Sequence, residues 1–383
     1  MALKAVFVSD VPSLDQVPEH ATTAIYSSRF SKGNDGGGRA SLKWPKFSII
    51  GHRGSGMNML HSPDRRMQAI KENSILSFNT AGKFAVDFVE FDVQVTKDDC
   101  PVIFHDDFIL TEENGQIFER RLTELTSAEF LSYGPKREPG YVGKTLLRKT
   151  KDGRIFNWKV EEDDAFCTLQ EAFQKVTPSL GFNIELKFDD HIVYRDEELI
   201  HVLQAVLRVV FEFATERPII FSTFQPDAAR LIKLLQSIYP VYFLTNGGTE
   251  IYTDVRRNSL EEAVKLCLAC GLQGIVSEVK AIFRNPATIN MIREANLSLL
   301  TYGQLNNVPE AVYMQHLMGV DGVIVDLVKE ITTAVSDYIN PVKEVEEDGL
   351  SAGDGQIQIA ERPKFSQREI SFLLKLIPEL IQV

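Results

Sequence analysis

The chain is poor in cysteine and tryptophan, with four and two residues of these types among 383. Four cysteines in a chain this long do not make the disulfide framework of a small secreted domain. Basic residues are also in the minority, and the net charge of −12 argues against a nucleic-acid-binding surface, which needs clustered lysine and arginine. The longest apolar stretch, 199–214, is interrupted by His201, Arg208 and Glu212. We therefore expect no nucleic-acid partner and no stable membrane insertion.

Residues 1–45 show little periodicity and contain a glycine-rich run at 33–38, which predicts a flexible N-terminal segment. Lys4, Asp10 and Asp15 interrupt the apolar core that a secretory signal requires, so we do not expect secretion. Serine and threonine are frequent in this segment, which keeps an organelle targeting peptide as an alternative. The expected location is the plastid (chloroplast) or the cytoplasm.

Between residues 46 and 340, short β-type runs alternate with helical patterns, which predicts an α/β fold of the TIM-type (β/α)8 barrel class. The nine expected strands are 47–51, 88–95, 102–104, 182–187, 218–222, 241–244, 274–277, 297–302 and 322–326. The expected helices are 73–84, 197–215, 226–237, 260–270, 286–295 and 308–318. The connection at 96–101 is too short for a parallel crossover, so the run 102–104 should return antiparallel as a hairpin.

Two regions depart from this alternation. Residues 107–164 form an insertion after the hairpin, and there the sequence predicts one helix at 121–133 and a cover that shapes access to a site. At the other end, 341–383 combine an acidic, glycine-rich linker with a capping box at Ser366 and Glu369 and an amphipathic helix. We expect this C-terminal helix to dock on the barrel, and an oligomer or partner contact through it is the alternative.

Polar residues follow or end four of the expected strands. Two histidines, two cations and three carboxylates make up this set: His52, Arg53, Glu90, Asp92, His105, Glu185 and Lys187. Active sites of such barrels lie at the C-terminal ends of the strands, so these side chains should meet. Glu90 and Asp92 point to the same side of their strand because they are two residues apart. Together with Glu185 they would repel one another without a cation, and hard oxygen ligands favour Mg²⁺ or Ca²⁺.

This inventory suits the hydrolysis of a phosphate ester, which needs charge neutralisation, a base and an acid. His52 and His105 are candidates for base and acid because a histidine pKa lies near neutrality. The Arg53 guanidinium can hold two phosphate oxygens, whereas the Lys187 ammonium acts as a point charge. An ion pair with Glu185 is the alternative role for Lys187.

The motifs of the chain resemble, over residues 46–326, those of the glycerophosphodiester phosphodiesterase family in its eukaryotic, plant-like form. They are His52-Arg53-Gly54, Glu72-Asn73, the run 90–98, His105-Asp106, the run 183–187, the run 221–224 and the run 319–326. The resemblance implies a TIM-type barrel with two acid/base histidines, three metal-ligating carboxylates and two phosphate-binding cations, in the residues already named.

The resemblance also implies the substrate and the course of the reaction. The substrate would be a deacylated phospholipid such as glycerophosphocholine, glycerophosphoethanolamine or glycerophosphoglycerol. Its products would be sn-glycerol 3-phosphate and an alcohol. The glycerol 2-hydroxyl would attack phosphorus, and water would then open the cyclic phosphate.

Three further residues receive supporting roles. Tyr302 stands where the family usually has tryptophan, and it would provide an aromatic wall for the glycerol or head group. Glu72 would orient Arg53, and Asn73 would cap the N-terminus of the first helix.

Two other functions compete with this interpretation. A sphingomyelinase D-like phospholipase would act on intact lipid and stop at a cyclic phosphate, but it would need exposed apolar loops, and none stands out in the sequence. A non-catalytic phosphate-binding barrel would use the cleft as a sensor and the C-terminal helix to recruit a partner.

Overall fold

The computed structural model describes residue 44 and residues 46–135 and 144–339. The expected N-terminal segment and the C-terminal helix lie outside these residues, apart from residue 44, and the domain limits 46–340 stay a prediction. None of the helices in the described part of the chain has the length and apolar character needed to cross a bilayer.

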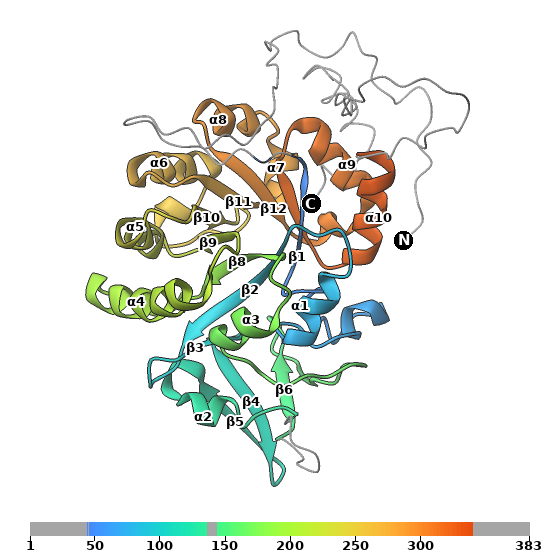
Figure 1. Ribbon diagram of the computed structural model, residues 1–383, viewed down its shortest axis with the longest axis vertical. Helices are drawn as coiled ribbons and strands as arrows, with labels where there is room; N and C mark the ends of the chain where they lie inside the picture. The colour runs from blue at the N-terminus through green and yellow to red at the C-terminus, as the bar shows by residue number, and fades with distance from the viewer. Residues whose placement is uncertain (1–43, 45, 136–143, 340–383) are drawn as a thin grey trace.

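Eight parallel strands close into a barrel, which confirms the predicted fold (Figure 1). The barrel strands are β1 (Ser48–Gly51), β2 (Phe88–Val95), β8 (Gly181–Leu186), β9 (Ile219–Thr223), β10 (Val241–Thr245), β11 (Gly274–Glu278), β12 (Ser298–Tyr302) and β13 (Gly322–Val325). Strand β1 pairs in parallel with both β13 and β2, and these pairings complete the ring. A ninth strand, β3 (Pro101–Ile103), runs antiparallel to β2, as the short connection predicts.

Helices cover the outside of the barrel. They are α1 (Ile75–Ala81), α3 (Leu169–Lys175), α4 (Asp196–Phe213), α5 (Pro226–Leu235), α6 (Leu260–Cys270), α7 (Val279–Arg284), α8 (Thr288–Glu294), α9 (Pro309–Met318) and α10 (Val328–Tyr338). Short 3-10 helices lie at Arg65–Gln68, Leu122–Glu124, Val255–Arg257 and Gln304–Asn307. The six predicted helices are all present, and the largest error is at the ends of α1. Helices α3, α7 and α10 are additional to these six.

The N-cap of α1 corrects one prediction. Ser74 occupies this position and its hydroxyl accepts a hydrogen bond from the main-chain N–H of Ser77. Asn73, the predicted cap, has a left-handed backbone with φ of 55° and donates its side-chain N–H to Asp92 instead. The tertiary contact in the site therefore outweighs the local capping preference of asparagine.

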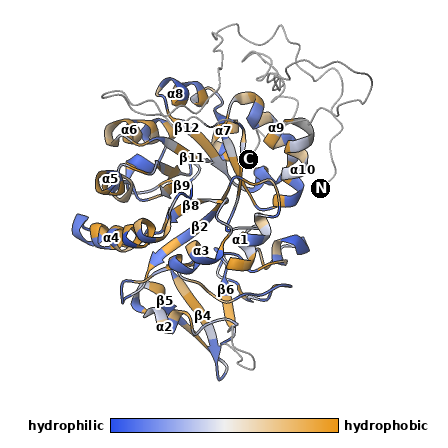
Figure 2. Cartoon of the chain, in the orientation of Figure 1, coloured by the Kyte–Doolittle hydropathy of each residue, from blue (hydrophilic) through white to orange (hydrophobic). Residues whose placement is uncertain are grey.

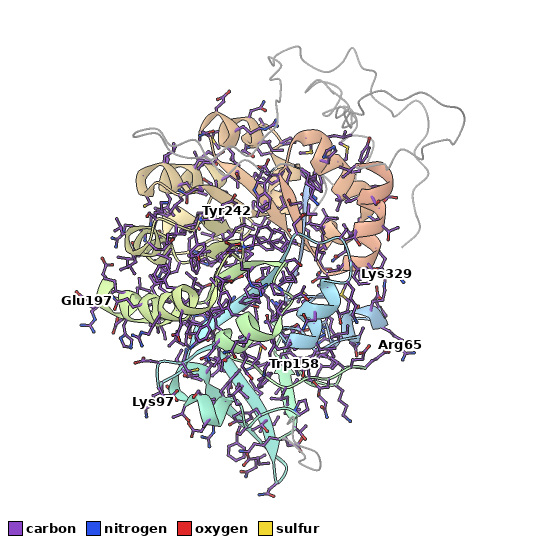
Figure 3. All side chains as sticks on the ribbon, viewed as in Figure 1. Arg65, Lys97, Trp158, Glu197, Tyr242 and Lys329 are labelled. Atoms are coloured by element: carbon purple, nitrogen blue, oxygen red, sulfur yellow. The ribbon has the colours of Figure 1, made fainter. Side chains whose placement is uncertain are left out.

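Two apolar layers hold the barrel together. The inner layer fills the lumen and consists of Ile50, Ile220, Tyr242, Leu244, Val276, Leu300 and Ile324. The outer layer lies between strands and helices, and helices such as α4 carry hydrophobic residues toward it and hydrophilic residues elsewhere (Figure 2). Tyr242 lies within the barrel, whereas Glu197 and Lys329 lie at its periphery (Figure 3). Side chains thus fill the lumen and leave the strand ends to form a site.

The insertion differs from the prediction. In place of a helix over 121–133, it contains α2 (Ser127–Phe130) and a four-stranded antiparallel sheet in the order β5-β4-β6-β7. The strands are β4 (Phe108–Glu113), β5 (Gln116–Arg121), β6 (Leu146–Lys149) and β7 (Ile155–Asn157). Asn114 and Gly115 join β4 to β5 with φ of 52° and 75°. An Asn-Gly pair is the strongest short-range hairpin signal in a sequence, because both residues tolerate a positive φ. The prediction missed it because β5 is largely exposed and has no buried face to give an apolar alternation.

Arg217 fastens the connection between α3 and β8 to the barrel wall. Its guanidinium donates to the carbonyl oxygens of Val176, Thr177 and Leu180 at 2.9, 2.8 and 2.6 Å. The residue is 6% exposed, so water cannot readily replace these hydrogen bonds.

We predict that Arg217→Ala lowers the free energy of unfolding by about 2 to 4 kcal/mol, because the buried carbonyls of Val176 and Leu180 lose their donor. Arg208→Ala on the exposed side of α4 is the matched control and should stay within about 0.5 kcal/mol of the parent. Urea unfolding followed by circular dichroism measures both. A loss for Arg217→Ala no larger than that of the control would contradict the prediction.

Candidate active site

The turn after β1 positions the first two polar residues of the site. The main-chain N–H of His52 donates to the carbonyl of Val325 at 2.9 Å, which continues the pairing of β1 with β13. Arg53 and Gly54 then adopt positive φ angles of 48° and 93°. A Cβ on Gly54 would lie 2.4 Å from Ser77 Oγ, so only glycine fits this close approach to α1.

The register between β2 and β8 gathers the three carboxylates. Asp92 pairs with Glu185 across the two strands, and Glu90 lies two residues earlier on the same side of β2. Oxygen atoms of Glu90, Asp92 and Glu185 all lie within 4.8 Å of one another. Glu90 Oε1 is buried and has no hydrogen-bond partner among the described residues. Three hard oxygen donors, one of them unsatisfied, fit a bound Mg²⁺ or Ca²⁺.

The pKa values of the three carboxylates shift in different directions. Burial, reinforced by the charge of Asp92, raises the pKa of Glu90 to about 8. Burial also raises the pKa of Glu185. The pKa of Asp92 is held below its usual range, because the nearby His105 and Arg53 outweigh the effect of burial. A divalent cation would relieve the repulsion that disfavours the ionised forms of Glu90 and Glu185.

Two glutamate side chains fix the position of Arg53 through hydrogen bonds. Its side-chain Nη1 donates to Glu72 Oε1 at 2.8 Å, and its main-chain N–H donates to Glu90 Oε2 at 3.0 Å. Arg53 Nε lies 3.4 Å from Asp92 Oδ2 but makes no hydrogen bond to the described residues. Asn73 donates its side-chain N–H to the same Asp92 oxygen at 2.9 Å. Glu72 and Asn73 therefore contact Arg53 and a carboxylate of the cluster respectively, one step behind the cavity.

Lys187 lies beside the carboxylates. Its Nζ is 2.9 Å from Glu185 Oε1 and 3.6 Å from Asp92 Oδ1. Burial would lower the pKa of Lys187, but these two carboxylates raise it above the usual lysine value. The ammonium therefore stays charged, in the ion pair that the sequence leaves as the alternative to phosphate binding.

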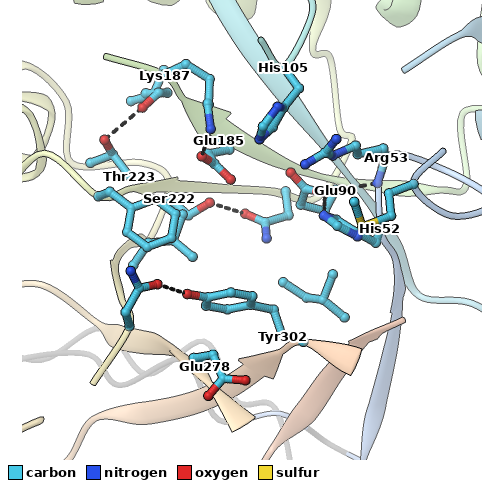
Figure 4. A pocket seen from close by; sticks show the side chains of 18 of the residues that line it. His52, Arg53, Glu90, His105, Glu185, Lys187, Ser222, Thr223, Glu278 and Tyr302 are labelled. Carbon is cyan, nitrogen blue, oxygen red and sulfur yellow. Dashed lines mark hydrogen bonds and ion pairs between the residues drawn. The ribbon is translucent and has the colours of Figure 1, made fainter. Parts of the chain in front are cut away.

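The two histidines are oriented in the same way by different carboxylates. His52 Nδ1 lies 2.7 Å from Asp326 Oδ1, and its Nε2 lies 3.9 Å from Glu90 Oε2. His105 Nδ1 lies 2.7 Å from Asp106 Oδ1. Both rings line one cavity, and Figure 4 shows them near Glu90 and Glu185. A carboxylate at Nδ1 fixes the ring and leaves Nε2 to exchange protons with a bound molecule.

The surroundings of the two rings differ in charge. Burial would lower the pKa of His52, but the carboxylate of Asp326 outweighs it and raises this pKa above 6.5. Burial, together with Arg53 and Lys187, lowers the pKa of His105 to about 4. The surroundings of the two imidazoles thus shift their pKa values in opposite directions.

The cavity has a volume of about 470 Å³. Tyr302 lies across it from the carboxylates, with its hydroxyl donating to Asn246 Oδ1 (Figure 4). Its ring meets Phe224 edge to face, with ring centroids 6.0 Å apart. The volume suits a small molecule with a polar and an aromatic wall. The cavity therefore receives every predicted residue except Asp92, Glu72 and Asn73, which lie directly behind its lining.

Comparison with known proteins agrees with this geometry. The model of the glycerophosphoryl diester phosphodiesterase family matches residues 52–330. This chain belongs to that family. It is 59% identical to a chloroplastic glycerophosphodiester phosphodiesterase of Arabidopsis thaliana and 58% identical to a second glycerophosphodiester phosphodiesterase of that plant, over the full length of all three chains. Its relatives are hydrolases of glycerophosphodiesters, so it is an enzyme of this class.

A solved structure supports the fold. A phosphodiesterase of Oleispira antarctica, in complex with the product sn-glycerol-3-phosphate, matches with a TM-score of 0.54 and 20% identity. The match covers 76% of this chain and 97% of that one. At this identity the likeness concerns the barrel alone.

Three residues that contact the family's motif side chains were not predicted as part of the site. Asp106 adjoins His105, and Asp326 directly follows β13, so the sequence shows both as carboxylates near a strand end. Arg148 donates to Glu72 and Asp106 from the insertion, where the prediction had no strand. The sequence around Arg148 offers no motif that could have found it.

The rim of the cavity corrects a further expectation. Val193, between β8 and α4, is 95% exposed, and Ile251, between β10 and α6, is 79% exposed. Asp190 and Tyr252 in the same two loops line the cavity. Exposed aliphatic side chains therefore occur in two loops that contribute to the cavity, although none stands out in the sequence.

Proposed function

We propose that the enzyme hydrolyses glycerophosphodiesters such as glycerophosphocholine, glycerophosphoethanolamine and glycerophosphoglycerol to sn-glycerol 3-phosphate and the free alcohol. The observation that carries this proposal is the convergence of two carboxylate-oriented histidines on a cavity next to a buried cluster of three carboxylates. Membership of the family supplies the substrate class, and the cavity supplies room for a small phosphodiester.

Glu90, Asp92 and Glu185 would hold the divalent ion, Mg²⁺ or Ca²⁺. When bound, this ion supplies positive charge that offsets the charge of the phosphate. Arg53 and Lys187 both line the cavity and would bind phosphate oxygens, Arg53 with its guanidinium and Lys187 with its ammonium.

In the first step one histidine of the pair His52 and His105 accepts the proton of the glycerol 2-hydroxyl. The oxygen of this hydroxyl forms a bond to phosphorus, the bond from phosphorus to the alcohol breaks, and the other histidine protonates the departing alkoxide. In the second step water adds to phosphorus, the ring bond to the 2-oxygen breaks, and the histidines exchange roles. Tyr302 would form the aromatic wall against which the glycerol or head group packs.

We predict that His52→Ala and His105→Ala each lower kcat by at least ~10²-fold, because each removes a proton-transfer group. Thermal melting should stay close to that of the parent enzyme, since both rings are partly exposed in the cavity. Steady-state hydrolysis of glycerophosphocholine measures the loss. If both variants hydrolysed the substrate near the parent rate, these histidines would not be the proton-transfer groups. If the parent enzyme bound glycerophosphocholine but did not hydrolyse it, the non-catalytic barrel would be favoured.

Removal of the metal should abolish hydrolysis, with Mg²⁺ or Ca²⁺ restoring it. A direct binding readout is the melting temperature, because an ion at about 100 times its Kd stabilises the folded state by about 2.7 kcal/mol. This stabilisation should disappear in Asp92→Asn, which changes one ligand at nearly constant volume. Full activity after exhaustive chelation would show that hydrolysis needs no metal. Equal stabilisation of the parent enzyme and Asp92→Asn by the ion would show that the ion does not bind at this cluster.

Product analysis separates the proposed reaction from the phospholipase alternative. The enzyme should convert glycerophosphocholine to sn-glycerol 3-phosphate and choline and leave sphingomyelin and lysophosphatidylcholine unchanged. Accumulation of a cyclic phosphate from either lipid would favour a sphingomyelinase D-like activity, for which Val193 and Ile251 at the rim would be the contact with the lipid surface.

We further propose that the enzyme works in the plastid or the cytoplasm. Of the two Arabidopsis relatives, one is named chloroplastic and the other is not. The full chain carrying a C-terminal fluorescent protein should co-localise with a plastid or a cytoplasmic marker in plant cells. Fluorescence in the secretory pathway would contradict this.

A further inference from the structure

We propose that Arg148, on strand β6 of the insertion, is a positioning residue that fixes His105 and Arg53 at the same time. The proposal rests on the function proposed above, in which these two side chains touch the substrate. It gives the insertion a part in the reaction itself, in addition to any part in covering the cavity.

The guanidinium of Arg148 is shared between two carboxylates. Its Nη1 donates to Glu72 Oε2 at 2.9 Å and to the carbonyl of Asn58 at 3.1 Å. Its Nη2 donates to Asp106 Oδ1 at 2.9 Å. The side chain is 11% exposed, so these hydrogen bonds are shielded from water.

Each of these two carboxylates also contacts a side chain that lines the cavity. Asp106 uses the same Oδ1 to hold His105 Nδ1 at 2.7 Å. Glu72 uses its other oxygen, Oε1, to accept from Arg53 Nη1 at 2.8 Å. One cation thereby determines where both carboxylates lie, and the two carboxylates determine the orientation of the imidazole and of the second guanidinium.

The insertion in turn determines where Arg148 lies. Its guanidinium packs over the ring of Trp158 at 4.3 Å from the ring centroid. Trp158 is 5% exposed and donates its indole N–H to Asn58 Oδ1 at 3.0 Å. Arg148 also pairs with Phe156 across β6 and β7. The antiparallel sheet and its aromatic core therefore hold the guanidinium in one orientation.

The geometry requires arginine in particular. Two separate nitrogens of a planar fork serve two carboxylates in different directions, which a single ammonium cannot do with the same geometry. Partners one step behind a reacting group commonly affect its activity through orientation alone.

The test is a double-mutant cycle on hydrolysis of glycerophosphocholine. Arg148→Ala should lower kcat/KM by roughly 10- to 100-fold in the parent enzyme. In the His105→Ala enzyme, where the ring to be oriented is absent, the loss from Arg148→Ala should be smaller by at least about threefold. A residual loss is expected there, because the contact through Glu72 to Arg53 is still removed.

Equal losses in the two backgrounds, within about twofold, would show that Arg148 acts independently of His105 and would overturn the proposal. Activity of Arg148→Ala near that of the parent would overturn it as well. A general weakening of the fold cannot imitate the expected result, because it would lower kcat/KM by the same factor in both backgrounds.

Two further variants complete the design. Arg148→Lys keeps a positive charge between Glu72 and Asp106 and should lose less activity than Arg148→Ala; it replaces Arg148→Ala in the cycle if that variant does not fold. Arg154→Ala, in the same insertion but with a side chain that is 61% exposed, should retain parental activity. A parent enzyme that cleaves no glycerophosphodiester would overturn the proposed function, whereas an active parent with equal losses overturns this inference alone.

Discussion

The repulsion among three buried carboxylates is the constraint on which the rest of the site depends. Glu90, Asp92 and Glu185 place oxygens within 4.8 Å of one another beside the cavity of a barrel whose lumen is filled by apolar side chains. Charges are costly in such surroundings unless each is paired. Arg53 and Lys187 pair with this cluster, yet Glu90 Oε1 is still unsatisfied among the described residues. One carboxylate oxygen of the cluster is thus left without a partner among the described residues, and a bound divalent cation would provide one.

Opposite charges alternate outward from this cluster. Arg53 lies between the cluster and Glu72, and Glu72 lies between Arg53 and Arg148. Arg148 also contacts Asp106, whose carboxylate pairs with His105. Removing one member of such a buried series costs more than its own hydrogen bonds, because it leaves a neighbouring charge unpaired. The antiparallel sheet of the insertion is therefore part of the electrostatic support of the barrel, and the two could not vary independently.

The sequence predicts the parts of this arrangement that depend on local spacing. The barrel strands are recognisable because they are buried on both faces, and Glu90 and Asp92 point the same way because they are two residues apart. The antiparallel β3 follows from a connection too short for a crossover. Contacts between distant residues are not predictable in this way: His52 and Asp326 are 274 positions apart. Asn73 shows the same limit, since a hydrogen bond to Asp92 overrides its preference for a helix N-cap.

One side of the cavity is built on barrel strands, and the opposite side includes a loop. This difference is relevant to substrate specificity. The groups proposed for acid/base chemistry, metal binding and phosphate binding stand on or shortly after β1, β2, β3 and β8, where strand pairing fixes their positions. The opposite wall combines Tyr302 at the end of β12 with Asn246 and Tyr252 in the loop after β10, joined by hydrogen bonds between their side chains. Loops tolerate substitution better than paired strands do. Under the proposed function, substitutions in the loop after β10 would therefore alter the wall that faces the head group without disturbing the carboxylates on β2 and β8.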